Sequence, residues 1–414
     1  MRTIQFKQNL SAIFILSIIF LWSIQFFIDD IGIPYYIVIS IPIVLYLKIN
    51  KTSVLSFTLL LLILLLIFFI QILQQITVSS FFKSILSTIM LSVLIIICLR
   101  MLDFCKKSIF IKFAKYFLYL QFLIMVYQTI SPHLGGVEYS THYKHLLLPI
   151  NRVSGLFSEP SIVAIGLSPF IYLSFFHYKE TVIMVGKRFF LLLYIILLLC
   201  PSTTLFGVFV ILITLFIYSN LTINKIYKIL LYITPLILLM IFSLEYFDAI
   251  NDRVQSIYSL LILNSSKIAS FNPSSLLFIK GGEMAFNGLI FHPLGVGIMN
   301  FEYLVNLSEV SYINDIYFEK NIKDGTSIFF KMVGEYGLFG LLVCVSAITI
   351  VLVNIRKDKF INLNILFLFG FMCSFIRSNS YFDGIQLLGL TVLFKLIKNR
   401  LHSIIKTSKI IIAH

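Results

Sequence analysis

Apolar runs long enough to cross a lipid bilayer recur along most of this chain. The hydrocarbon core of a bilayer is about 30 Å thick, so a spanning helix needs roughly 17–25 mostly apolar residues. The 414 residues are 59% hydrophobic and only 12% charged, which leaves too few polar side chains to cover a water-soluble domain. We therefore predict an all-α, polytopic membrane protein.

Counting these runs predicts about twelve transmembrane helices. The first run follows Arg2 and Lys7 but is not followed by a small-residue cleavage site, so we interpret it as an uncleaved span. The runs on either side of Pro201-Ser202 are either two tilted spans or one broken hairpin. The predicted helices lie near 10–28, 31–49, 53–73, 82–99, 110–130, 160–176, 188–200, 203–219, 229–247, 328–353, 360–376 and 384–398.

Basic residues are distributed unevenly between the two predicted sides of the membrane. With both termini in the cytoplasm, 22 of the 32 lysines and arginines fall on the cytoplasmic side, although the longer loops lie outside. Such an excess is typical of cytoplasmic loops. It accounts for the net charge of +14 without nucleic acid binding, and we expect no nucleic acid partner.

Two long polar segments, 131–159 and 248–327, are predicted outside the cytoplasm, and we expect any chemistry to occur there. Residues 274–290 of the second loop have the pattern of an amphipathic helix lying on the membrane surface. The five cysteines show no CxxC spacing and none lies in either loop, which argues against disulfides and a zinc site. No internal repeat is visible, so we treat 1–414 as one domain.

The first loop ends with a cation and a carboxylate close to the start of a span. Pro160 suits the first turn of that helix, which places Glu159 at the N-cap, where a carboxylate meets free backbone amides. Arg152 lies seven residues earlier. Either these two residues have structural roles, as a helix cap and a lipid-headgroup anchor, or they belong to a reaction site.

Two further motifs are candidates for chemistry. Gly295 and Gly297 allow a tight turn and a close approach to a ligand, and His292 titrates near neutral pH, although a histidine before proline is more often structural. Glu335 lies inside a predicted span, where an acidic residue costs about 2.5–3.5 kcal/mol. It should therefore face protein, a water-filled cavity or Lys331, four residues back.

In chain order the motifs are Arg152-x-x-Gly155-x-Phe157-x-Glu159-Pro160, Pro201-Ser202-Thr203-Thr204 with Gly207, His292-Pro293-Leu294-Gly295-Val296-Gly297, and Glu335-Tyr336-Gly337-Leu338-x-Gly340. Their order and spacing resemble the superfamily of O-antigen polymerases (Wzy-type) and O-antigen ligases. The resemblance covers roughly residues 110–345. It implies an enzyme that acts on sugars linked to undecaprenyl diphosphate at the outer face of the bacterial cytoplasmic (inner) membrane, without a nucleotide sugar, cofactor or metal.

One departure favours the polymerase within this superfamily. Ligases carry a His-Asn pair nine residues before the glutamate of the last motif, where this chain has Thr326-Ser327. The resemblance therefore implies a glycosyltransferase that joins repeat units into O-antigen or capsular polysaccharide, with a chain-length regulator and a flippase as candidate partners. The alternatives are an O-antigen ligase, a polysaccharide flippase or other transporter, and a lipid-carrier glycosyltransferase that uses Asp29-Asp30.

The resemblance also implies roles for individual residues. We expect Arg152 to bind the leaving diphosphate, because a guanidinium binds phosphate oxygens in pairs and stays charged. The base that takes the acceptor hydroxyl proton is Glu159 or His292, and we favour Glu159. Arg253 and Lys280 are alternatives for a second-loop cation. These two residues, Gly295, Gly297 and Glu335 are predicted to bind substrate.

Overall fold

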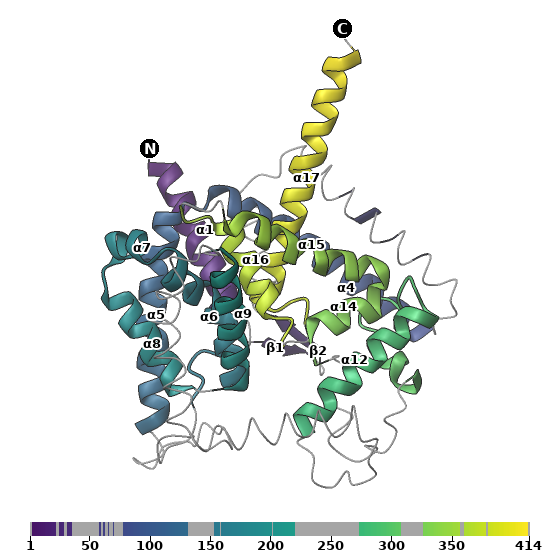
Figure 1. Ribbon diagram of the computed structural model, residues 1–414, viewed down its shortest axis with the longest axis horizontal. Helices are drawn as coiled ribbons and strands as arrows, with labels where there is room; N and C mark the ends of the chain where they lie inside the picture. Colours follow the sequence, from purple (N-terminus) through teal and green to yellow (C-terminus); the bar gives the residue numbers. More distant parts are fainter. Residues whose placement is uncertain are drawn as a thin grey trace.

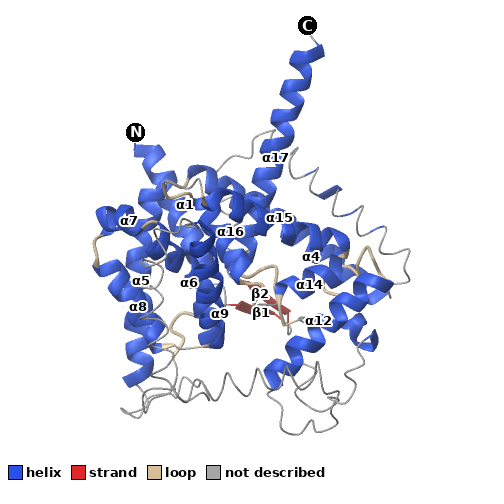
Figure 2. Cartoon of the chain, in the orientation of Figure 1, coloured by secondary structure: helices blue, strands red, loops and turns tan. Residues whose placement is uncertain are grey.

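The computed structural model describes residues 2–21, 25–28, 31–34, 78–130, 153–157, 159–200, 202–219, 273–307, 326–356, 360–377 and 380–412, together with five isolated residues between 58 and 69. These residues form helices and one short β-hairpin (Figure 2). The helices are α1 (Arg2–Leu21), α4 (Val78–Phe104), α5 (Lys107–Ile130), α6 (Pro160–Phe176), α7 (Tyr178–Val185), α8 (Arg188–Leu199), α9 (Thr203–Ser219), α12 (Pro273–Phe291), the 3-10 helix η4 (Phe301–Leu307), α14 (Ile328–Tyr336), α15 (Leu338–Ile355), α16 (Leu363–Cys373) and α17 (Gly384–Ile412).

Four of the described helices are long and apolar enough to cross a membrane. They are Thr3–Leu21, Ser84–Phe104, Lys107–Ile130 and Leu338–Ile355, and the pair formed by α6 and α7, bent by 106°, is a fifth if it counts as one span. Helices α8, α9 and α16 are apolar but shorter. The chain is therefore a helical protein with several membrane-capable helices, and the twelve-span topology stays a prediction.

Three of the predicted spans, 10–28, 31–49 and 328–353, are wrong in part. Residues 25–28 and 31–34 form the antiparallel strands β1 (Gln25–Ile28) and β2 (Ile31–Pro34), so the first helix ends at Leu21 and no helix begins at residue 31. A short apolar run fits a strand as well as a helix, and Gly32 and Pro34 are poor helix residues. The predicted span 328–353 is also interrupted, because Gly337 has φ +58° and separates α14 from α15.

The core of the bundle is apolar and rich in aromatic rings. Helix α1 packs against α4 and α5, and α16 packs against α6, α15 and α17. Phe170 of α6 stacks on Phe20 of α1 and on Phe110 of α5, with ring centroids 5.9 Å and 6.1 Å apart. Apolar residues on the outer surface, such as Leu342 and Val345 of α15, are exposed, as expected of helices that face lipid.

Two ion pairs mark the end of the bundle where α4 ends and α5 begins. Lys395 of α17 pairs with Asp103 of α4 at 2.7 Å, and Lys107 of α5 pairs with Glu180 of α7 at 2.6 Å. Both ends of the chain lie on this side, and the β-hairpin lies away from them (Figure 1). Helix α6 therefore begins, at Pro160, at the end of the bundle opposite the chain ends.

A second, smaller apolar cluster joins α12 to α14 and η4. Its buried residues include Met284 of α12, Phe301 and Leu304 of η4 and Val333 of α14. Helix α12 lies where an amphipathic helix was predicted at 274–290, with one apolar face buried in this cluster and with Phe286 and Ile290 exposed. Its position on the membrane surface stays a prediction.

Replacing Gly337 by alanine should destabilise the fold more than the same change at Gly186. Both glycines have positive φ, +58° and +83°, in sparsely populated conformations that cost an L-residue about 1–3 kcal/mol. A Cβ at Gly337 would also overlap the carbonyl of Pro293, whereas a Cβ at Gly186 meets nothing within 4 Å. Thermal unfolding of the purified protein in detergent should give a clearly lower midpoint for Gly337→Ala, and equal shifts for the two variants would contradict this packing.

Candidate functional site

Two glutamines of α5 hold the backbone of the first motif. Gln121 donates to the Ser154 carbonyl at 2.9 Å and accepts from the Leu156 amide at 2.7 Å. Gln128, two helical turns further, accepts from the Gly155 amide at 2.8 Å and donates to the Gly155 carbonyl at 3.2 Å. These four hydrogen bonds tie the backbone of residues 154–156 to α5, shortly before the chain enters α6.

The glycine and the phenylalanine of this motif have structural roles. Gly155 has φ +63° and lies so close to Gln121 that a Cβ would overlap its amide. Phe157 is buried against Gly166 of α6, where a Cβ would overlap its ring. Both residues thus fix the path of the chain toward Glu159.

Glu159 is at the N-cap of α6 by backbone geometry, with φ −143° and ψ 151°, and Pro160 is the first helical residue, as predicted. Its side chain makes no hydrogen bond to the helix amides. The carboxylate instead accepts from the Ser161 hydroxyl at 3.0 Å, and its Oε2 lies 3.7 Å from Nη2 of Arg377. About half of the Glu159 side chain is exposed, so the carboxylate is accessible to a ligand. Arg152 and Arg253 lie outside the described residues.

The third and fourth motifs dock on each other through their backbones. The amides of Val296 and Gly297 donate to the carbonyls of Gly334 and Glu335 at 3.1 Å and 2.9 Å, and the Leu338 amide donates to the Pro293 carbonyl at 2.9 Å. A Cβ at Gly295 would overlap the Glu335 carbonyl. These glycines approach protein backbone at the break between α14 and α15, and their assignment to substrate binding stays a prediction.

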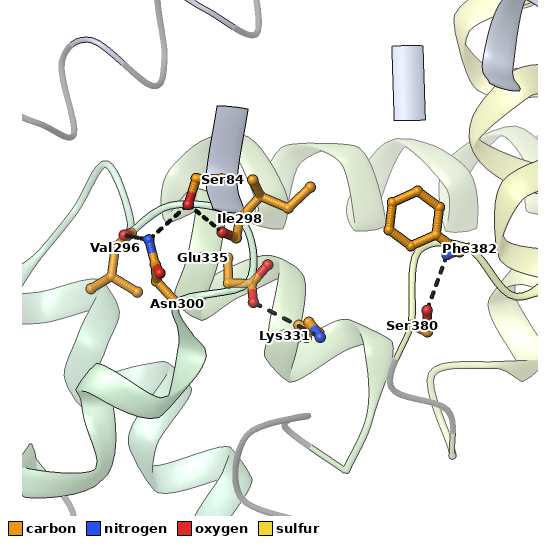
Figure 3. Close-up of polar contacts among 8 residues, drawn as sticks. All are labelled: Ser84, Val296, Ile298, Asn300, Lys331, Glu335, Ser380 and Phe382. Carbon is orange, nitrogen blue, oxygen red and sulfur yellow. Dashed lines mark hydrogen bonds and ion pairs between the residues drawn. The ribbon is translucent and has the colours of Figure 1, made fainter. Parts of the chain in front are cut away.

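Polar side chains fix the end of this loop to α4. The Ser84 hydroxyl donates to the Ile298 carbonyl at 2.7 Å, and the Asn300 amide donates to Ser84 Oγ at 3.0 Å and to the Val296 carbonyl at 3.2 Å (Figure 3). His292 is partly exposed at the end of α12, where its carbonyl accepts from the Gly295 amide at 2.8 Å. The backbone of His292 thus takes part in a turn, and the role of its imidazole as the alternative base stays a prediction.

Glu335 faces Lys331, as predicted, and both side chains are almost completely buried. Lys331 Nζ lies 3.9 Å from Glu335 Oε1 (Figure 3). It also lies 5.6 Å from the centre of the Tyr381 ring. The Tyr381 hydroxyl and the backbone amides of Met299 and Phe301 lie beside the carboxylate. The pair therefore sits where α14, the 292–300 loop and the segment before α17 meet.

Lys280 lies on the buried face of α12 and is 2% exposed. Burial lowers its pKa, an effect that the nearby Glu283 carboxylate opposes. Because burial disfavours the charged form of Lys280, this lysine is less suited than an arginine to provide a permanent positive charge for substrate binding.

Sequence reasoning missed the segment between α16 and α17, which contacts three of the motif regions. The Ser327 hydroxyl, next to α14, donates to the Phe375 carbonyl at 2.7 Å. Ile376 packs on Gly207 of α9, where a Cβ would lie 2.8 Å from its Cδ1. Arg377 pairs with Glu159. We refer to Phe375–Arg377 as the junction segment.

Sequence signals for the missed residues exist but are weak. Gln121 and Gln128 are amides seven residues apart in an otherwise apolar run, and so lie on one helix face. Arg377-Ser378-Asn379-Ser380 is a polar stretch between two apolar runs. Neither pattern predicts which residues these side chains contact, because the contacts join residues far apart in the sequence.

The sequence matches no known protein-family profile, and no match to a curated protein is found.

Replacing one residue of the buried Lys331–Glu335 pair should lower the stability of the fold more than replacing both. Lys331→Met leaves the Glu335 carboxylate buried without its cation, which typically costs about 3–5 kcal/mol. Replacing both residues, as Lys331→Met with Glu335→Leu, removes the buried charge as well as the ion pair and should recover much of that loss. A double-mutant cycle on thermal unfolding midpoints measures the coupling, and additive effects would show that the two side chains do not interact.

Proposed function

We propose that this protein is a polysaccharide polymerase that joins undecaprenyl-diphosphate-linked oligosaccharide repeat units into O-antigen or capsular polysaccharide. The observation that carries the proposal is the convergence of the motif regions at one end of the bundle. Glu159, Gly207 and Ser327 contact the junction segment, and the Pro293–Gly297 loop docks on the break between α14 and α15. These contacts join residues that are far apart in the sequence.

The proposed reaction transfers a glycan from one lipid carrier to another. A hydroxyl of the acceptor unit attacks the anomeric carbon of the donor, a new carbon–oxygen bond forms, and the bond to the polyprenyl diphosphate breaks. The hydroxyl proton passes to a base, and the negative charge that develops on the diphosphate needs a cation. Glu159, half-exposed at the start of α6, is our choice for the base, with His292 as the alternative, and Arg152 for the cation.

In the proposed orientation, the site lies at the outer face of the membrane, where the lipid-linked sugars would be joined. The excess of basic residues predicts cytoplasmic termini. Both chain ends lie on one side of the bundle (Figure 1), and Glu159 belongs to the other end. We therefore propose a site at the outer face of the cytoplasmic membrane, with the bilayer, a chain-length regulator and a flippase as partners.

The local structure around Ser327 supports a polymerase over a ligase. Ser327 and Thr326 occupy the positions of the ligase His-Asn pair. The Ser327 hydroxyl accepts from the Phe329 amide at 3.2 Å and donates to Phe375, so it caps α14. Thr326 stands where a ligase has its histidine, and Ser327, at the position of the asparagine, caps a helix instead.

The glycan profile of a deletion strain tests the function. Without a polymerase, single repeat units should still reach their normal acceptor, because export and ligation continue. Loss of a ligase should instead leave long polymer on undecaprenyl diphosphate, and loss of a flippase should hold single units on the cytoplasmic face. Wild-type chain should restore polymer, and a profile of either of the other two kinds would refute the assignment.

A further inference from the structure

We propose that Arg377 is a second anion-binding residue of the site, which binds the diphosphate of the lipid-linked donor. The inference rests on the proposed function and adds a residue from the segment between α16 and α17. It is carried by the position of the Arg377 side chain, its exposure, and the distribution of the other described arginines.

The chain immediately before Arg377 is held by two separate elements. Phe375 is fixed through its carbonyl by Ser327, and its ring lies 5.8 Å from that of Phe329 in α14. Ile376 is held against Gly207 of α9. Two consecutive anchored residues leave the following backbone little freedom, so the start of the Arg377 side chain is positioned before any ligand arrives, beside Glu159.

The ion pair with Glu159 leaves room for a ligand. The Arg377 and Glu159 side chains are 41% and 52% exposed, and the contact joins one guanidinium nitrogen to one carboxylate oxygen at 3.7 Å. Such solvated pairs contribute at most about 1 kcal/mol. A guanidinium has five N–H donors in a planar fork that matches phosphate oxygens. Diphosphate can therefore compete for Arg377 at small cost, beside the proposed base.

The location of Arg377 is unusual among the arginines that the structure describes. Arg356 packs its guanidinium 4.0 Å from the Tyr218 ring, and Arg188 begins α8, both at the end of the bundle that carries the chain termini. Arg100 lies near Asp103 in the last turns of α4, at the same end. Within the described ranges, Arg377 is the arginine at the opposite end, where the positive-inside rule favours fewer basic residues.

The test is a binding measurement on the full chain in lipid nanodiscs. Undecaprenyl diphosphate is the probe, and undecaprenol, which has the same tail without charge, is the comparison. Losing a charge-assisted hydrogen-bonding partner should weaken diphosphate binding by about tenfold or more in Arg377→Ala. Arg377→Lys should fall between wild type and Arg377→Ala, and none of these variants should change the affinity for undecaprenol.

Two controls separate anion binding from a structural role. Arg356→Ala removes an exposed arginine at the other end of the bundle and should bind the diphosphate as wild type does. Glu159→Gln breaks the same ion pair but keeps the guanidinium, so it should keep or increase the affinity for diphosphate. Equal losses in Glu159→Gln and Arg377→Ala would show that the pair only supports the fold, and would overturn the inference.

The outcomes also distinguish this inference from the proposed function. If wild-type protein binds undecaprenyl diphosphate no better than undecaprenol, both are overturned. If wild type prefers the diphosphate and Arg377→Ala binds it as tightly, the inference alone is overturned. A third outcome combines two results: Arg377→Ala loses the selective binding, but the glycan profile of the deletion strain is not that of a polymerase. That outcome would support the anion site and refute the proposed function.

Discussion

The backbone hydrogen bonds between the Pro293–Gly297 loop and the broken end of α14 are the contacts on which the candidate site depends. They satisfy amides and carbonyls that a helix break would otherwise leave unpaired in an apolar environment, where each unpaired group is costly. Gly295 and Gly337 permit this approach because neither has a Cβ. At the other end of α14, Ser327 caps the helix and donates to the Phe375 carbonyl of the junction segment.

The residues of the candidate site divide into those that shape the chain and those that face solvent. Gly155 and Phe157 are packed against α5 and α6, and Gly207 receives Ile376. Glu159 and Arg377 are about half-exposed; they pair with each other, and Glu159 also accepts from the Ser161 hydroxyl. The motif glycines thus help to place a small number of charged groups, which are the candidates for the proposed chemistry.

Much of the fold follows from the sequence, and the features that were missed depend on information that neighbouring residues do not carry. Apolar runs located most of the described helices, and Pro160 located the start of α6, because both signals depend on neighbouring residues. The hairpin at 25–34 was missed because a short apolar run has no distinguishing period. The break at Gly337 and the role of Arg377 were missed because they depend on contacts with Pro293 and Glu159, more than 40 residues away in the sequence.

The most direct test of this account is whether the first motif meets the junction segment in the membrane. Cysteines replacing Glu159 and Arg377, with a protease site inserted between residues 220 and 272, should be joined by a short thiol cross-linker, so that the two fragments stay together after cleavage. Cysteines replacing Glu159 and Lys395, which lie at opposite ends of the bundle, should not be joined. Separation of the fragments in the first pair, with both cysteines reactive, would contradict the convergence of the motifs.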